Sequence, residues 1–166
     1  MDSSPKSNGF TLVELVIVII LIGIVSLFAS SRYVSSSSFS TYLVQSEVLA
    51  SLRLVQNRAM SRAGYCNRWL LNPSQTQAIQ VSPSSTEDIC SEAFPSDVTD
   101  SSFVDGTQNK VAFKLQTDTN VSYLDFDRLG RSQQCLVSNC QLEISSTVND
   151  DSISVCINTE GYIYGC

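Results

Sequence analysis

The chain has 166 residues, with 10 Lys and Arg against 16 Asp and Glu, a formal net charge of −6 and no histidine. Its length suits one folded domain with appended segments. An acidic balance without any Lys- or Arg-rich run argues against a nucleic-acid partner. The lack of histidine removes the commonest general base and the commonest zinc ligand. We therefore expect no nucleic-acid partner, no metal, no cofactor and no enzyme activity.

Residues 12–29 read LVELVIVIILIGIVSLFA, an apolar run in which Glu14 is the one charged residue. About 20 such residues in a helix span the roughly 30 Å hydrocarbon core of a bilayer. An ordinary secretory signal has a shorter run followed by a small-residue cleavage site, and the sequence carries no convincing site of that kind. The run therefore predicts a membrane helix.

Glu14 lies near the start of this run, where an unpaired carboxylate is energetically costly. If the chain is cut between Gly9 and Phe10, the new α-ammonium group lies about one helical turn before Glu14. It could then neutralise Glu14 in the same chain or in a neighbouring copy.

The segment Gly9-Phe10-Thr11-Leu12-Val13-Glu14-Leu15, followed by the apolar run, resembles the amino terminus of type IV pilins and type II secretion pseudopilins. The resemblance implies that Gly9 is the last leader residue, cut by the prepilin peptidase, and that Phe10 becomes the N-methylated first residue. It implies that Glu14 is the assembly glutamate. The implied partners are other pilin or pseudopilin subunits, the prepilin peptidase/N-methyltransferase, an inner-membrane assembly platform and, before assembly, the membrane itself.

Two departures from the family pattern bear on the kind of subunit. The leader holds one basic residue, Lys6, offset by Asp2, and Ser31 stands where many major pilins have a helix-kinking proline. The second departure favours a minor subunit. The resemblance further implies an inner-membrane location with a periplasmic globular domain, followed by a place in a pilus or pseudopilus at the cell surface.

A second helical pattern follows the membrane segment. Residues 39–63 contain no Gly or Pro, and apolar residues recur at helical spacing at Val44, Val48, Leu52, Val55 and Ala59, before a stop at Gly64. We predict one helix over residues 10–63, loosened near the serines at 35–38. The predicted organisation is a leader at 1–9, a transmembrane or filament-core helix at 10–31, an amphipathic helix at 32–63, and a disulfide-containing β-sheet domain at 64–166.

Beyond Gly64 apolar residues alternate with period two between turn signals. The predicted strands are Gln77–Val81, Lys110–Gln116, Val121–Phe126, Gln134–Val137, Gln141–Ser146, Ser152–Asn158 and Tyr162–Tyr164, and Ser82–Gly106 is predicted to be a long exposed loop. Consecutive strands with hairpin-length gaps predict an α+β fold, in which an antiparallel sheet packs on the amphipathic second half of the long amino-terminal helix.

The carboxyl-terminal half adds a second resemblance. The segments Leu124-Asp125-Phe126-Asp127-Arg128-Leu129-Gly130-Arg131 and Glu160-Gly161-Tyr162-Ile163 resemble H-type minor pseudopilins and minor pilins of the mannose-sensitive haemagglutinin type. We interpret the chain as a minor pilin of a type IV pilus that initiates or supports filament assembly, with adhesion as a further role. The alternatives are a minor pseudopilin of a type II secretion system, or a periplasmic sensor or enzyme domain on a membrane anchor.

Six cysteines lie after the apolar run: Cys66, Cys90, Cys135, Cys140, Cys156 and Cys166. Their even number predicts a disulfide framework in an oxidising compartment, whereas the lack of a C-x-x-C pair and of histidine argues against zinc. Many connectivities are possible, and our working choice joins neighbours, Cys66 to Cys90, Cys135 to Cys140 and Cys156 to Cys166.

Two further groups of residues could form binding sites. The segment Asp125–Gly130 begins like a calcium loop, but Leu129 replaces a ligand, which favours a solvated turn. Trp69, Tyr65 and the pair Tyr162 and Tyr164 could form a sugar or receptor platform, although such residues more often pack against a core.

Overall fold

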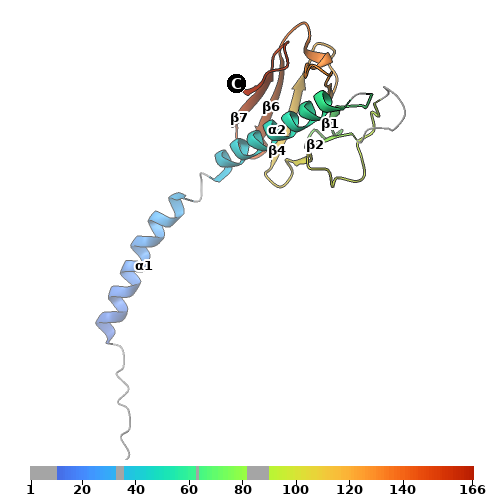
Figure 1. Ribbon diagram of the computed structural model, residues 1–166. Helices are drawn as coiled ribbons and strands as arrows, with labels where there is room; N and C mark the ends of the chain where they lie inside the picture. Colours follow the sequence, from blue (N-terminus) through green and yellow to red (C-terminus); the bar gives the residue numbers. More distant parts are fainter. Residues whose placement is uncertain (1–10, 33–35, 63, 82–89) are drawn as a thin grey trace, which may run out of the picture. The chain divides into compact units, whose positions relative to one another are not determined.

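The computed structural model describes residues 11–32, 36–62, 64–81 and 90–166, and residues 1–10, 33–35, 63 and 82–89 lie outside this description. The chain divides into two compact units, Met1–Ser36 and Ser37–Cys166. The first holds helix α1 (Leu12–Arg32), and the second holds nearly all of α2 (Ser36–Ser61) and the strands (Figure 1). Because residues 33–35 are not described, the predicted continuity of one helix over 10–63 stays a prediction. In the described ranges no helix satisfies the combined length and hydropathy that a membrane crossing requires.

Helix α2 buries one apolar stripe, as its spacing predicts. Its five core residues are almost completely inaccessible to solvent: Val44, Val48, Leu52, Val55 and Ala59. The helix ends at Ser61, and Gly64 follows with a φ of 77°, a left-handed conformation that glycine adopts without steric cost. The predicted amphipathic helix and its glycine stop are therefore both present.

The strands form two antiparallel sheets of four strands each. The first has the order β3-β2-β1-β5, with β1 (Arg68–Leu71), β2 (Gln77–Gln80), β3 (Val104–Asp105) and β5 (Tyr123–Asp125). The second has the order β4-β6-β7-β8, with β4 (Val111–Gln116), β6 (Cys140–Ser146), β7 (Ser152–Ile157) and β8 (Ile163–Gly165). Trp69 and Leu124 of the first sheet, and Phe113 and Ile144 of the second, belong to the same core cluster as the α2 stripe. The α+β class is thus confirmed, with two sheets where one was predicted.

Three local predictions were wrong, each for a physical reason. Predicted strand Gln134–Val137 contains a 3-10 helix, Gln133–Cys135, because the buried Gln134 side chain accepts a hydrogen bond from the Asp125 N–H at 2.7 Å. Strand β1 was missed because all four of its residues are buried, which leaves no alternation to detect. Strand β3 lies inside the predicted loop Ser82–Gly106, where Val104 is buried.

Two turns of the same construction meet at α2. In each, an Asp or Asn begins a four-residue turn that closes on a glycine with positive φ: Asp127 with Gly130 (φ 79°) and Asn158 with Gly161 (φ 87°). The Gln56 side-chain nitrogen donates to the carbonyl oxygens of both glycines, at 2.6 Å each. These turns contain the residues that resemble minor pseudopilins, and their function in the fold is to hold α2 against both sheets.

We predict that Gly161→Ala destabilises the chain by about 2–4 kcal/mol, because strain at a positive φ is joined by a steric clash. A Cβ at this position would lie 2.2 Å from the Gly130 carbonyl oxygen. Gly64→Ala is the matched control, since its φ is also positive but nothing lies within 4 Å of the added Cβ. Thermal unfolding of the full chain in mild detergent should therefore rank Gly161→Ala well below Gly64→Ala, and equal effects would contradict the close approach.

Asp127 is a titratable group within the first of these turns. Burial raises the pKa of its carboxyl, but hydrogen bonds from the backbone and side chain of Arg131 and from the Leu129 N–H outweigh burial, so the pKa lies below its usual value. Arg131 Nη2 lies 2.9 Å from Asp127 Oδ2. A carboxyl with a lowered folded-state pKa stabilises the fold above its unfolded-state pKa, near about 4, and this contribution is lost as pH falls through the folded-state value.

We predict that Asp127→Asn lowers the unfolding free energy at pH 7 by about 1 kcal/mol or less, since the ion pair is partly exposed to solvent. As pH falls from 7 through the lowered folded-state pKa, the wild-type carboxyl itself becomes protonated, so the difference between the two proteins should shrink at strongly acidic pH. Urea unfolding at both pH values measures this, and a difference that grows on acidification would show the opposite sign.

Candidate functional site

The amino-terminal helix begins with a side-chain cap. The Thr11 hydroxyl accepts a hydrogen bond from the Glu14 N–H at 3.3 Å, and the Thr11 carbonyl accepts one from the Leu15 N–H at 3.2 Å. Thr11 is therefore the N-cap residue and Glu14 the third residue of α1, the spacing of a capping box. A carboxylate in the first turn also interacts favourably with the helix dipole. Gly9 and Phe10, the predicted processing and methylation residues, lie outside the described part of the chain.

Beyond Glu14, α1 is apolar around its whole circumference. Every described side chain from Leu12 to Ser26 is exposed, including Ile17, Ile20 and Ile24. An exposed helix that is apolar on all sides requires lipid or other protein around it. The segment therefore combines an exposed carboxylate near its start with an apolar surface that needs a partner.

All six cysteines lie in the globular unit, and all are joined in disulfides. The structure pairs Cys66 with Cys90, Cys135 with Cys140, and Cys156 with Cys166, and no cysteine is free. The expectation of disulfide bonds is confirmed, and these pairs are the neighbours that our working choice joined.

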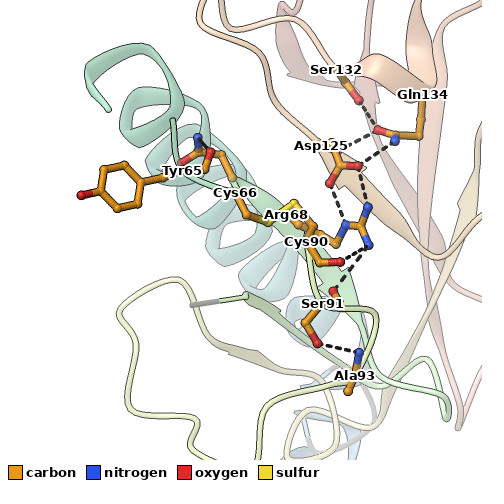
Figure 2. Close-up of polar contacts among 10 residues, drawn as sticks. Tyr65, Cys66, Arg68, Cys90, Ser91, Ala93, Asp125, Ser132 and Gln134 are labelled. Carbon is orange, nitrogen blue, oxygen red and sulfur yellow. Dashed lines mark hydrogen bonds and ion pairs between the residues drawn. A yellow bond between two sulfur atoms is a disulfide. The ribbon is translucent and has the colours of Figure 1, made fainter. Parts of the chain in front are cut away.

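The first disulfide lies beside a partly buried ion pair. Arg68 Nε and Nη2 donate to the two carboxylate oxygens of Asp125, at 2.7 and 2.8 Å, and so join β1 to β5. Figure 2 shows the opposite edge of the same guanidinium facing the carbonyl oxygens of Cys90 and Ser91. The Gln134 amide donates to Asp125 from the other side, at 3.2 Å. Because each of its charged groups is paired, this cluster stabilises the fold and leaves no free charge for chemistry.

The aromatic residues and the calcium-like segment singled out in the sequence do not form one binding site in the structure. Trp69 is fully buried, and its indole N–H donates to the Ser51 hydroxyl at 2.9 Å, so it belongs to the core. Tyr162 and Tyr164 stack on one another with ring centroids 5.4 Å apart. The Asp127 oxygens in the calcium-like segment accept hydrogen bonds from their own turn. Across the described ranges, no group of His, Cys, Asp and Glu gathers in a way that could hold a metal.

Sequence reasoning missed Gln56, Arg68 and the capping function of Thr11. The pattern Thr11-x-x-Glu14 was a detectable signal for the cap, because it precedes an apolar run. Gln56 and Arg68 gave no comparable signal, since their partners lie far away along the chain.

Comparison with known proteins gave one family match and a structural likeness. Residues 4–30 match the family described as the prokaryotic N-terminal methylation motif. None of the curated proteins compared with the chain matches it in sequence.

Two crystal structures of the type IV minor pilin FimU of Pseudomonas aeruginosa share the fold. One, in space group P65, has a TM-score of 0.53 at 16% identity, covering 75% of this chain and 91% of the FimU chain. The other, in space group P21, has a TM-score of 0.55 at 16% identity, covering 76% of this chain and 87% of the FimU chain. At this level of identity the likeness establishes the fold alone. The comparisons therefore give a methylation motif at the amino terminus and the fold of a type IV minor pilin in the rest of the chain.

Proposed function

We propose that the chain is a minor pilin subunit that initiates or supports assembly of a type IV pilus. The observation that carries the proposal is that one chain contains both a methylation motif, which includes Glu14, and a globular unit with the fold of a type IV minor pilin. In this proposal the prepilin peptidase cuts after Gly9, Phe10 is N-methylated, and α1 resides in the inner membrane with the globular unit in the periplasm. The assembly platform then inserts the subunit into the filament.

The apolar surface of α1 supports this proposal on physical grounds. Its exposed side chains, such as Leu15 and Ile22, need lipid before assembly and other helices afterwards. In a bundle of such helices Glu14 would be a buried anion. Its best partner is the Phe10 ammonium of an adjacent subunit, since a head-to-tail pairing of this kind generates an open helical filament. A neighbour without the matching charge is penalised, so the pair would select register.

A minor pseudopilin of a type II secretion system is the second candidate. The turn around Gly130 and the later turn around Gly161 are compatible with it, because these segments resemble H-type minor pseudopilins as well as minor pilins. The FimU likeness favours the pilus. Co-purification of the native chain with either a pilus or a secretion system separates the two.

The first test concerns processing. We predict that Gly9→Glu leaves an unprocessed precursor in the membrane, because the peptidase must accept a small residue before the cut. Gly9→Ala is the matched control and should still be processed. Intact-mass analysis measures the outcome, and a wild-type chain that still begins at Met1 in peptidase-competent cells would contradict the proposal.

The second test concerns assembly. We predict that Glu14→Ala is processed and stays in the membrane but enters filaments about tenfold less well or worse, since an unpaired buried charge costs roughly 3–5 kcal/mol. Glu47→Ala is the control, because Glu47 is an exposed carboxylate on α2. Quantitative immunoblotting of sheared filaments compares the two, and normal incorporation of Glu14→Ala would contradict the pairing of Glu14 with the Phe10 ammonium of an adjacent subunit.

A further inference from the structure

A hollow of about 510 Å³ opens on the globular unit near the ends of β1, β4 and β5. Leucines form part of its floor, Leu70 and Leu71 from β1 and Leu115 from β4. Its polar wall consists of Gln75, Glu92, Asn120, Ser122 and the ring of Tyr123. Most of these polar side chains are exposed, and neither Gln56 nor the two glycines that it contacts belong to the lining.

Three of the polar side chains in this wall have no hydrogen-bond partner among the described residues, whereas Tyr123 and Glu92 interact with Arg68. No hydrogen bond joins the side chains of Gln75, Asn120 or Ser122 to another side chain or to backbone in that part of the chain. The second hollow of the globular unit, about 470 Å³ and lined by Arg68 and Asp125, differs in this respect because its charges are paired with each other. The first hollow therefore presents free donors and acceptors, whereas the second does not.

The backbone adds an independent observation. Three described residues other than glycine have a positive φ, and two of them line this hollow: Gln75 (φ 55°) and Asn120 (φ 54°). The third, Lys110 (φ 53°), is not part of the lining. Left-handed backbone is unfavourable for a residue with a side chain, and such strain concentrates where a side chain is used. Glycine at either position would relieve the backbone strain but would remove the side-chain amide.

Local hydrogen bonds hold both strained turns in place. The Asn72 side-chain oxygen accepts from the N–H groups of Thr76 and Gln77, at 2.8 and 3.1 Å, next to Gln75. The Thr117 hydroxyl accepts from the Val121 N–H at 3.1 Å, next to Asn120. Because these turns are already ordered, the side-chain amides of Gln75 and Asn120 would lose little backbone entropy when a ligand binds.

The chemistry of the wall indicates the class of ligand. Side-chain amides and a hydroxyl both donate and accept hydrogen bonds, as the hydroxyl groups of a sugar do. Tyr123 adds a ring, held in place by the Arg68 guanidinium 3.6 Å from its centroid. The one formal charge in the lining is the Glu92 carboxylate, so an anionic ligand would be repelled. We propose that this hollow binds a neutral saccharide.

An adhesive role for the hollow rests on the proposed function, whereas saccharide binding itself does not depend on filament assembly. The purified full chain in mild detergent can therefore be applied to an array of neutral oligosaccharides beside sialylated and sulfated ones. The expected result is retention on neutral glycans and none on anionic ones. Ligand-observed NMR with the free form of the best neutral glycan then measures the affinity.

Glycine substitutions provide a matched set of variants. Gln75→Gly and Asn120→Gly remove the amides while the left-handed backbone is kept without strain, so both variants should fold. Each should lower the affinity about tenfold, the value of one good hydrogen bond. Lys110→Gly makes the same kind of change outside the hollow and should bind like the wild type.

Three outcomes would overturn the inference: retention of no neutral glycan, retention of anionic glycans alone, or unchanged affinity in both Gln75→Gly and Asn120→Gly. Filament incorporation is measured on the same variants and should be normal. Absent glycan binding with normal incorporation contradicts the hollow alone, whereas glycan binding by a wild-type chain that is missing from sheared filaments contradicts the proposed function alone.

Discussion

The Gln56 side chain donates from one nitrogen to the carbonyl oxygens of Gly130 and Gly161, and the arrangement of the globular unit depends on this pair of bonds. Gly130 lies in the turn after β5, beside the first sheet, and Gly161 lies in the turn between β7 and β8 of the second. A single amide therefore fixes α2 against both sheets at one point. The apolar stripe of α2 supplies burial energy, which is not directional, whereas the amide selects one position along the helix.

The two turns can meet at this point because each ends in glycine. A Cβ on Gly161 would overlap the Gly130 carbonyl, and that carbonyl is itself one of the Gln56 acceptors. Glycine at 161 is thus required twice, for a positive φ and for the close approach of two backbones. This explains in physical terms why the segments that resemble minor pseudopilins contain these glycines.

The sequence predicted those elements whose signal is local and periodic. The stripe from Val44 to Ala59 was detectable because one face of α2 is buried and the other is not. Strand β1 was not detectable, because Arg68 is buried with its neighbours and is neutralised by Asp125, far away along the chain. Gln134 illustrates the same limit, since its position follows from a bond to the Asp125 backbone.

Prediction of the functional residues had the same limit: local motifs were detectable in the sequence, whereas residues that only folding brings together were not. Gly9, Phe10 and Glu14 lie in one short segment, so a family resemblance could predict processing, methylation and assembly roles for them, and these roles stay predictions. The hollow beside Gln75 and Asn120 is formed by residues from β1, β4, β5 and three connecting segments, and it exists only after the two sheets have come together. Nothing in the sequence indicates that Gln75 adopts a left-handed backbone, because glutamine is not a residue that normally favours it.

The disulfides leave the attachment of α2 to non-covalent contacts. Their sequence separations of 24, 5 and 10 residues close short loops, each worth about 2–3.5 kcal/mol in the chain-entropy account. None involves α2, which is held by its apolar stripe and by bonds such as Gln45 to the Ser154 carbonyl at 2.7 Å and Arg53 to the Ile163 carbonyl at 3.0 Å. In the proposed filament α1 is buried among other helices, so force on the sheets reaches α1 through α2, by way of these contacts and of the backbone that continues from α2 to β1. The directional bonds of Gln45, Arg53 and Gln56 resist sliding of α2 along the sheets, which apolar packing alone opposes weakly.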